Sequence, residues 1–204
     1  MRIGVFGGTF DPPHNGHYKY ACEAMEKLML DRLIVIPASI PPHKAGKGIS
    51  DGADRLKMTE LLFSDDERVS VSDMELKRQG KSYTVDTVKE LRKTYPEDEI
   101  YFLMGSDMLL SFHTWYCPDE IIKCVRIGAV TRCDEIPETE LEEYVKEHFP
   151  EDTDRFEICD FEPIELNSTE VRTAVRNGED ISSMVNPQVE AYIKERKLYL
   201  ERLD

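Results

Sequence analysis

The chain has 204 residues, 40% of them hydrophobic, and a formal net charge of −15. This length fits one compact domain, so we expect a single domain over residues 1–204, its final helical part starting at about residue 167. The acidic charge argues against nucleic acid or an anionic membrane as a partner, because both attract basic protein surfaces.

The beginning of the chain and its cysteines both favour a cytoplasmic protein. Met1 leads directly into a short apolar run, which is unlike a signal peptide. The five cysteines are odd in number, widely spaced and contain no Cys-x-x-Cys pair. This pattern favours reduced thiols over disulfides or a zinc site, and we assign the cysteines no chemistry.

Short apolar runs alternate with amphipathic helical patterns along the chain. The runs at residues 3–6, 33–36, 100–104 and 125–130 are too short to span a membrane and predict buried strands. Strands that alternate with helices are typical of a parallel α/β sheet, doubly wound and covered by helices on both faces.

Residues 7–17, between the first strand and the first helix, hold two glycines, two histidines and a pair of prolines. Gly16 and His17 fall near the start of the helix, where free N–H groups and the helix dipole favour an anion. Gly7 and Gly8 let a phosphate approach the backbone. The turn therefore predicts a phosphate site with His14 and His17 as cations, rather than a capped turn with two surface histidines.

The segment Gly-Gly-Thr-Phe-Asp-Pro-Pro-His-x-Gly-His resembles the His-x-Gly-His signature of the nucleotidyltransferase superfamily, in the form carried by bacterial nicotinate mononucleotide adenylyltransferases. The resemblance implies a Rossmann-like fold and transfer of the adenylyl group of ATP to nicotinate mononucleotide, which gives deamido-NAD and pyrophosphate. It also implies that ATP and its phosphates contact the residues of this turn, namely Gly7, Gly8, Thr9, Phe10, His14, Gly16 and His17.

A loop rich in proline and glycine follows the second strand, at residues 41–52. Its Pro-Pro-His-Lys run recurs in the same family. Lys44 stands after the carboxyl end of a strand, where open α/β sheets bind their ligands, so we expect it to reach a phosphate. The alternative is a lysine in solvent.

The segment Ser-Tyr-Thr-Val-Asp-Thr at residues 82–87 precedes an amphipathic helix, and Thr84 is a natural N-cap for it. Capping alone would explain Thr84. The segment is also similar to the family's binding segment for the nicotinate ring and its carboxylate. The resemblance thus assigns Tyr83 and Thr84 to the mononucleotide.

A turn of small residues, Gly105-Ser106-Asp107, follows the strand at residues 100–104, and Trp115-Tyr116 comes shortly after it. A single tryptophan can simply belong to the core. In the family, however, such a turn and a Trp-Tyr pair line the pyridine pocket. The resemblance implies that Trp115 stacks on the ring, and that Asp107 bonds either a ribose hydroxyl or its own turn.

Residues 166–172 open a helix that Asn167 or Ser168 caps and that Gly178 ends. Ser168, Thr169 and Arg172 are suited to a triphosphate, although a good cap and a solvent arginine are the plain alternative. The run resembles the family's Ile-Ser-Ser-Thr-x-x-Arg motif.

This sequence departs from the family at four places. Leu166 and Asn167 replace Ile and Ser, which threatens phosphate binding little because asparagine also caps helices. Cys133-Asp134 after Arg132 replaces Pro-Gly, which leaves the role of Arg132 open. Asn186 is an extra residue before Pro187, but the pair still makes a sound helix start.

The sequence thus predicts an adenylyltransferase with ATP and nicotinate mononucleotide as its partners. His14, His17, Lys44 and Arg172 are its expected catalytic residues, Mg²⁺ arrives with ATP, and no protein group ligates the metal. An enzyme for another phosphate substrate such as phosphopantetheine, and a nucleotide sensor without activity, are the alternatives. A homo-oligomer is left open.

Overall fold

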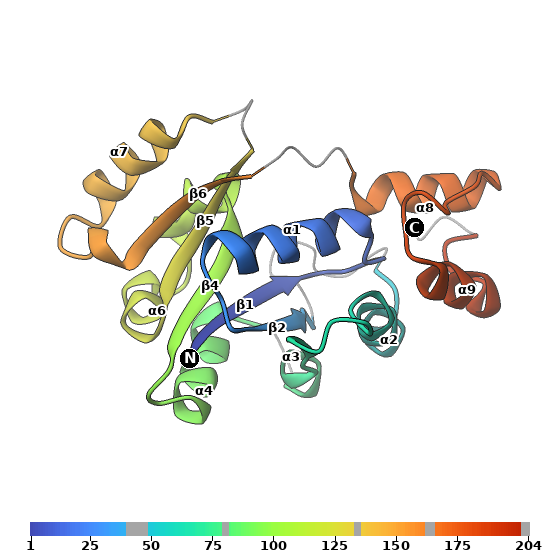
Figure 1. The fold of residues 1–204 in the computed structure, drawn as a ribbon, viewed down its shortest axis with the longest axis horizontal. Helices are drawn as coiled ribbons and strands as arrows, with labels where there is room; N and C mark the ends of the chain where they lie inside the picture. Colours follow the sequence, from blue (N-terminus) through green and yellow to red (C-terminus); the bar gives the residue numbers. More distant parts are fainter. Residues whose placement is uncertain (40–48, 79–81, 133–135, 162–165, 201–204) are drawn as a thin grey trace. The chain divides into compact units, whose positions relative to one another are not determined.

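The computed structural model describes residues 1–39, 49–78, 82–132, 136–161 and 166–200, without the side chains of residues 131 and 132. Its six strands form one sheet in the order β3-β2-β1-β4-β5-β6, and helices alternate with them (Figure 1). The predicted α/β class with a doubly wound parallel sheet is confirmed. The strands are β1 (Arg2–Gly8), β2 (Arg32–Pro37), β3 (Val69–Val71), β4 (Glu99–Gly105), β5 (Arg126–Arg132) and β6 (Phe156–Phe161).

The helices connect these strands in chain order. They are α1 (Asn15–Lys27), α2 (Gly52–Leu62), α3 (Met74–Lys77), α4 (Thr84–Thr94), α5 (Ser106–Leu109), α6 (Pro118–Cys124), α7 (Glu138–His148), α8 (Ser168–Asn177) and α9 (Pro187–Arg196), with the 3₁₀ turns η1 (Phe112–Thr114) and η2 (Thr153–Arg155). Among the described residues, no helix has both the length and the apolar character that a membrane crossing requires.

The chain divides into two compact units that alternate along the sequence. Unit 1 comprises Met1–Phe6, Cys22–Ile34 and Tyr83–Ile164, and unit 2 comprises Gly7–Ala21, Val35–Ser82 and Glu165–Asp204. We describe each unit by itself. A single domain over residues 1–204 stays a prediction.

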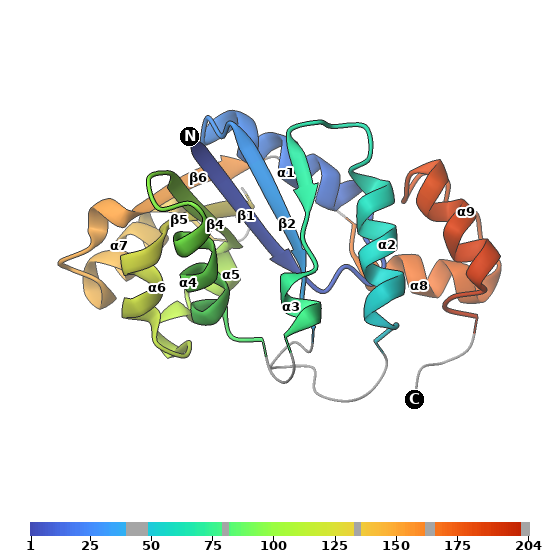
Figure 2. The same cartoon turned by 90° about the horizontal axis from the view of Figure 1, so that it is seen from below.

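Unit 1 contains the parallel strands β1, β4, β5 and β6. Arg2 of β1 stands opposite Glu99 of β4, and the register continues to Phe6 opposite Leu103. β4 and β5 pair in the same sense, as do β5 and β6. Helices α4 and α6 lie side by side and α7 packs on β6 (Figures 1 and 2). Most apolar side chains of β1, β4 and β5 are buried, as expected for parallel strands covered on both faces, whereas in β6 only Phe161 is buried.

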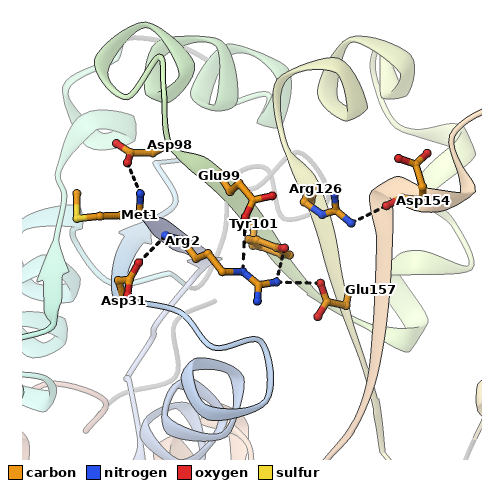
Figure 3. A network of polar contacts seen from close by, with 9 residues as sticks. All are labelled: Met1, Arg2, Asp31, Asp98, Glu99, Tyr101, Arg126, Asp154 and Glu157. Atoms are coloured by element: carbon orange, nitrogen blue, oxygen red, sulfur yellow. Dashed lines mark hydrogen bonds and ion pairs between the residues drawn. The ribbon is translucent and has the colours of Figure 1, made fainter.

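A polar network fastens the amino ends of the unit 1 strands (Figure 3). The guanidinium of Arg2 lies over the Tyr101 ring, 4.7 Å from its centroid, bonds the Tyr101 hydroxyl and pairs with Glu157 at 3.2 Å. Arg126 donates to the Asp154 carbonyl at 2.6 Å. None of the predicted site residues belongs to this network.

A second cluster in unit 1 is built on one arginine, which we call the Arg92 clamp. The half-buried guanidinium of Arg92 donates only to main-chain carbonyls, at 2.7 to 3.2 Å. These carbonyls belong to the turn before β4 and to the end of α6, and the four residues are Tyr95, Pro96, Asp98 and Cys124.

Unit 2 contains α2, β3, α3, α8 and α9, together with the first half of α1. Helix α9 packs on α2, where the buried Asp54 accepts hydrogen bonds from Tyr192 at 2.8 Å and Arg196 at 3.1 Å. Asn186 caps α9 and also donates to the Leu61 carbonyl at 3.0 Å. The predicted start at Asn186-Pro187 is confirmed.

The other predicted helix ends are correct except for one. Asn167 caps α8 with a complete capping box, and Gly178 ends it at φ 71°. Thr84 is not the N-cap of α4, because Tyr83 holds that position in extended backbone and Thr84 is already helical. The Tyr83 side chain makes no capping hydrogen bond. Within the described parts, Cys22, Cys117, Cys124 and Cys159 are free thiols.

Candidate active site

The turn between β1 and α1 is shaped by a buried aromatic ring. Phe10 is 1% exposed and has a φ of 51°, and the peptide bond from Asp11 to Pro12 is cis. A Cβ on Gly8 would lie 2.9 Å from Cζ of the Phe10 ring. Gly8 therefore makes room for Phe10, a reason that differs from the close phosphate approach expected from the sequence.

The two histidine rings of the turn lie close together, with their planes tilted by 37°. Their ring centroids are 3.7 Å apart, and the Phe10 ring meets His17 edge-on at 4.9 Å. The backbone N–H of His14 donates to Nδ1 of His17 at 3.2 Å, so this nitrogen accepts and carries no proton. The neutral His17 ring consequently holds its proton on Nε2.

The sequence predicts that these histidines are cations, whereas burial disfavours the charged form of both rings. Burial lowers the pKa of His14 to about 4. Burial, and next the charge of the adjacent His14 ring, lower the pKa of His17 well below its ordinary value. Both rings are therefore neutral at pH 7, because a buried turn offers little solvation to an imidazolium.

His14 also carries an unsatisfied polar atom. Its side chain is 5% exposed, and its Nδ1 is buried with no hydrogen-bond partner among the described residues. A buried polar group without a partner is costly in a folded protein, so such an atom points to a ligand or an ordered water.

The first turn of α8 joins this histidine turn. Ser168 Oγ donates to the Pro12 carbonyl at 2.9 Å, and Arg172 Nη1 donates to the Asp11 carbonyl at 2.7 Å. Arg172 Nη2 also donates to Thr169 Oγ1 at 3.0 Å. Two motifs predicted separately thus meet within unit 2, and Arg172 is half-buried beside the turn.

Asp11 is the buried acceptor of the site, 3% exposed. Its Oδ1 accepts from the Tyr199 hydroxyl at 2.7 Å and its Oδ2 from the Ser50 backbone N–H at 3.1 Å. Burial, followed by the Asp11 charge, raises the pKa of Tyr199, so this hydroxyl remains a donor. Both Asp11 oxygens are thus engaged by the protein, which suits a Mg²⁺ ion that is held by phosphates and water.

The sequence analysis missed one cation in this unit. Arg55 of α2 is 2% exposed, and its guanidinium donates to the carbonyls of Thr9, Ser39 and Ser50. No local pattern distinguishes it from a surface arginine, since its partners are distant in sequence. We call this arrangement the Arg55 clamp.

Two predicted residues cannot be compared with the structure. Lys44 lies outside the described residues, and so does the Arg132 side chain. In the described parts, no group of three or more histidine, cysteine, aspartate or glutamate side chains could hold a metal ion. Mg²⁺ brought by ATP therefore stays a prediction.

Unit 1 holds all the residues predicted for the mononucleotide. The rings of Tyr83 and Tyr116 lie 4.8 Å apart, and Tyr116 is 62% exposed. Thr84 follows Tyr83 as the first helical residue of α4, and N–H groups in the first turn of a helix have no partner within it. This arrangement offers an exposed aromatic surface beside donors for an anion.

Trp115 is half-buried and meets Phe112 and Phe102 edge-on, with ring centroids 5.3 and 6.2 Å away. It therefore belongs partly to the core and partly to the surface. Asp107 is exposed, and a Cβ on Gly105 would lie 2.7 Å from its Oδ1. Among the hydrogen bonds described for this turn, none is accepted by the Asp107 carboxylate.

An open parallel sheet whose first strand leads into a turn with two histidines defines a nucleotidyltransferase of Rossmann-like fold. Comparison with known families agrees, because the sequence model of the cytidylyltransferase-like family matches residues 5–184. Within that family, relatives that are 39% and 40% identical show that the chain belongs to the nicotinate-nucleotide adenylyltransferases.

Two curated relatives support this assignment. A "probable nicotinate-nucleotide adenylyltransferase" of Shouchella clausii is 40% identical over 97% of this chain and 96% of its own. The protein of the same name from Exiguobacterium sibiricum is 39% identical over 98% of this chain and 99% of its own.

Solved structures support the fold. Nicotinic acid mononucleotide adenylyltransferase of Plasmodium falciparum, complexed with NaAD, has a TM-score of 0.78 at 19% identity, covering 98% of this chain and 100% of that one. The same enzyme complexed with APC has a TM-score of 0.76 at 18% identity, covering 98% of this chain and 99% of that one.

Proposed function

We propose that this protein transfers the adenylyl group of ATP to nicotinate mononucleotide, forming deamido-NAD and pyrophosphate in NAD biosynthesis. Full-length similarity to relatives that carry this activity in their names supports the proposal. The observation that carries it is the pairing of His14 with His17 beside the arginine of α8, within one unit.

The proposed chemistry requires no protein nucleophile. The 5′-phosphate of the mononucleotide is already anionic, so one of its oxygens attacks the α-phosphorus of ATP directly. A new P–O bond forms as the bond to the leaving pyrophosphate breaks. Correct positioning and stabilisation of the developing charge are then sufficient for catalysis.

In our proposal the ATP phosphates lie against the unit 2 turn. His17 donates from Nε2, and His14 uses the Nδ1 that lacks a partner. Arg172 keeps donors beyond those it directs at Asp11 and Thr169, and together with Lys44 it contacts the leaving pyrophosphate. Ser168, Thr169 and the backbone of Gly7, Gly8, Thr9, Phe10 and Gly16 complete this binding set.

Mg²⁺ bound to the phosphates would neutralise part of their charge. Because Asp11 is engaged by Tyr199 and Ser50, we assign the ion no protein ligand.

We assign the mononucleotide to the unit 1 residues. Trp115 and Tyr116 supply aromatic surface for the pyridine ring, while Tyr83 and the start of α4 at Thr84 meet its carboxylate. Asp107, beside Gly105, bonds a ribose hydroxyl, which the lack of a described partner for its carboxylate favours. We place the protein in the cytoplasm, where its free thiols and its nucleotide substrates fit.

The test is pyrophosphate release with ATP and Mg²⁺, with nicotinate mononucleotide, nicotinamide mononucleotide and phosphopantetheine compared side by side. We expect a strong preference for the first. Equal use of both pyridine nucleotides would refute the carboxylate contact at Thr84. Activity with phosphopantetheine alone would reassign the substrate, and silence with all three from a folded protein that binds ATP would indicate a sensor.

A further inference from the structure

The Arg55 clamp spans three backbone segments of unit 2. Nη1 donates to the Thr9 carbonyl at 2.8 Å, Nη2 to the Ser39 carbonyl at 3.2 Å, and Nε to the Ser50 carbonyl at 3.1 Å. Thr9 belongs to the histidine turn, Ser39 follows β2, and Ser50 precedes Asp51, the N-cap of α2. One side chain thus connects three separate segments, and Arg55 itself lies 46 residues from Thr9 in sequence.

A buried carboxylate completes the arrangement. Asp11 attracts Arg55 electrostatically and binds the Ser50 N–H, while Arg55 binds the carbonyl of the same residue. The Ser50 backbone is therefore held on both sides by charged groups that are 2% and 3% exposed. Such burial is tolerated only where each charge has its partners, and here the partners include the turn that carries His14 and His17.

We propose that Arg55 is a positioning residue for the adenylyl transfer, which fixes the histidine turn against the start of α2 without touching the substrate. The inference rests on the proposed function. The guanidinium fork suits three carbonyls in separate directions, whereas the ammonium of lysine is a point donor and cannot reproduce that geometry.

The test compares Arg55→Lys with Arg92→Lys. Both substitutions keep the positive charge and disturb a guanidinium that bonds main-chain carbonyls, but the Arg92 clamp holds no predicted site residue. We expect Arg55→Lys to lower kcat about 100-fold with a smaller change in KM for ATP, because small misplacements of catalytic groups are that costly. Arg92→Lys should leave kcat within about twofold.

Histidine NMR reports on the turn without requiring activity. In Arg55→Lys, we expect the pKa of His14 to rise towards its ordinary value as the turn opens to water, and the His17 Nδ1 shift to change as its bond from the His14 N–H weakens. An Arg55→Lys protein with wild-type kcat and unmoved histidine resonances would overturn the proposal. If wild type shows no transfer, the proposed function fails, but these resonances still decide the role of Arg55.

Amide hydrogen exchange in wild type covers the case in which Arg55→Lys does not fold. We expect the Ser50 N–H and the His14 N–H to exchange in the same opening event, because the Arg55 clamp holds both segments. Their protection factors should agree within about twofold. Fast exchange at Ser50 with strong protection at His14 would refute the proposal.

Discussion

The Arg55 and Arg92 clamps use the same interaction in the two units with different consequences. Each guanidinium donates to carbonyls from separate segments of backbone. The Arg92 clamp secures a turn and a helix end, and none of its partners is a predicted site residue. The Arg55 clamp secures the turn of His14 and His17. We therefore expect an identical interaction to affect chemistry only through what its partner segments carry.

The largest expected effect is a loss of kcat on substituting a histidine of unit 2, with a histidine of unit 1 as the control. His17→Ala should lower kcat at least about 100-fold, because it removes a preorganised donor for developing charge, while the free energy of unfolding changes little. Steady-state kinetics and urea unfolding measure both quantities. His148→Ala in unit 1, where the ring stacks on Tyr144, is the control and should keep wild-type kcat. A folded His17→Ala protein with wild-type turnover would refute the mechanism.

The next prediction tests whether the Arg92 clamp is purely structural. Arg92→Met should lower the free energy of unfolding by roughly 2 kcal/mol, because it leaves the partly buried carbonyls of Asp98 and Cys124 without their donors. We expect kcat and KM in the folded protein to stay within about twofold. Denaturant unfolding together with kinetics checks this, and a large fall in kcat without lost stability would contradict the comparison.

The pH dependence of stability should depend on the buried histidines of unit 2. The pKa of His14 is about 4 in the folded protein, against an ordinary value of 6.5, so the unfolded chain binds more protons between these pH values. The stability that the neutral His14 ring contributes is fully present above pH 6.5 and is lost as the pH falls towards 4. It amounts to about 2 kcal/mol between pH 7.5 and pH 5.

Urea unfolding of wild type and His14→Asn at these two pH values isolates this contribution. The carboxylates titrate in both proteins, so the difference between them reports on the imidazole. We expect the loss of stability at pH 5 to be smaller in His14→Asn. An identical loss in both proteins would show that His14 is not buried as a neutral ring.

The smallest expected effect compares two glycines. Gly8→Ala should force the Phe10 ring to shift, costing about 1–2 kcal/mol of stability and lowering kcat several-fold, because that ring contacts His17. Gly178→Ala is the control, since a Cβ there would meet nothing within 4 Å and only its φ of 71° is unfavourable. It should cost about 1 kcal/mol and leave kcat unchanged, as unfolding and kinetic assays would show.

The sequence predicts β1, β2, β4 and β5, the helix starts at Asn167 and Asn186, and the histidine turn, because periodicity and capping are local properties. It does not predict the short β3 or the half-polar β6. It does not predict the neutral histidines, since their charge depends on burial by residues elsewhere in the chain. Arg55 is missed for a related reason, because its partner Thr9 is 46 residues away. Tyr83 occupies the N-cap position that the sequence predicts for Thr84. The capping preference of threonine thus placed the start of α4 one residue too late.

The bond between Tyr199 and Asp11 joins residues that are 188 positions apart. During synthesis, Asp11 leaves the ribosome long before Tyr199, and much of the sheet can assemble in between. The histidine turn therefore reaches its final form only after Tyr199 has been made. A nascent chain can thus hold a folded sheet before it can hold a finished active site.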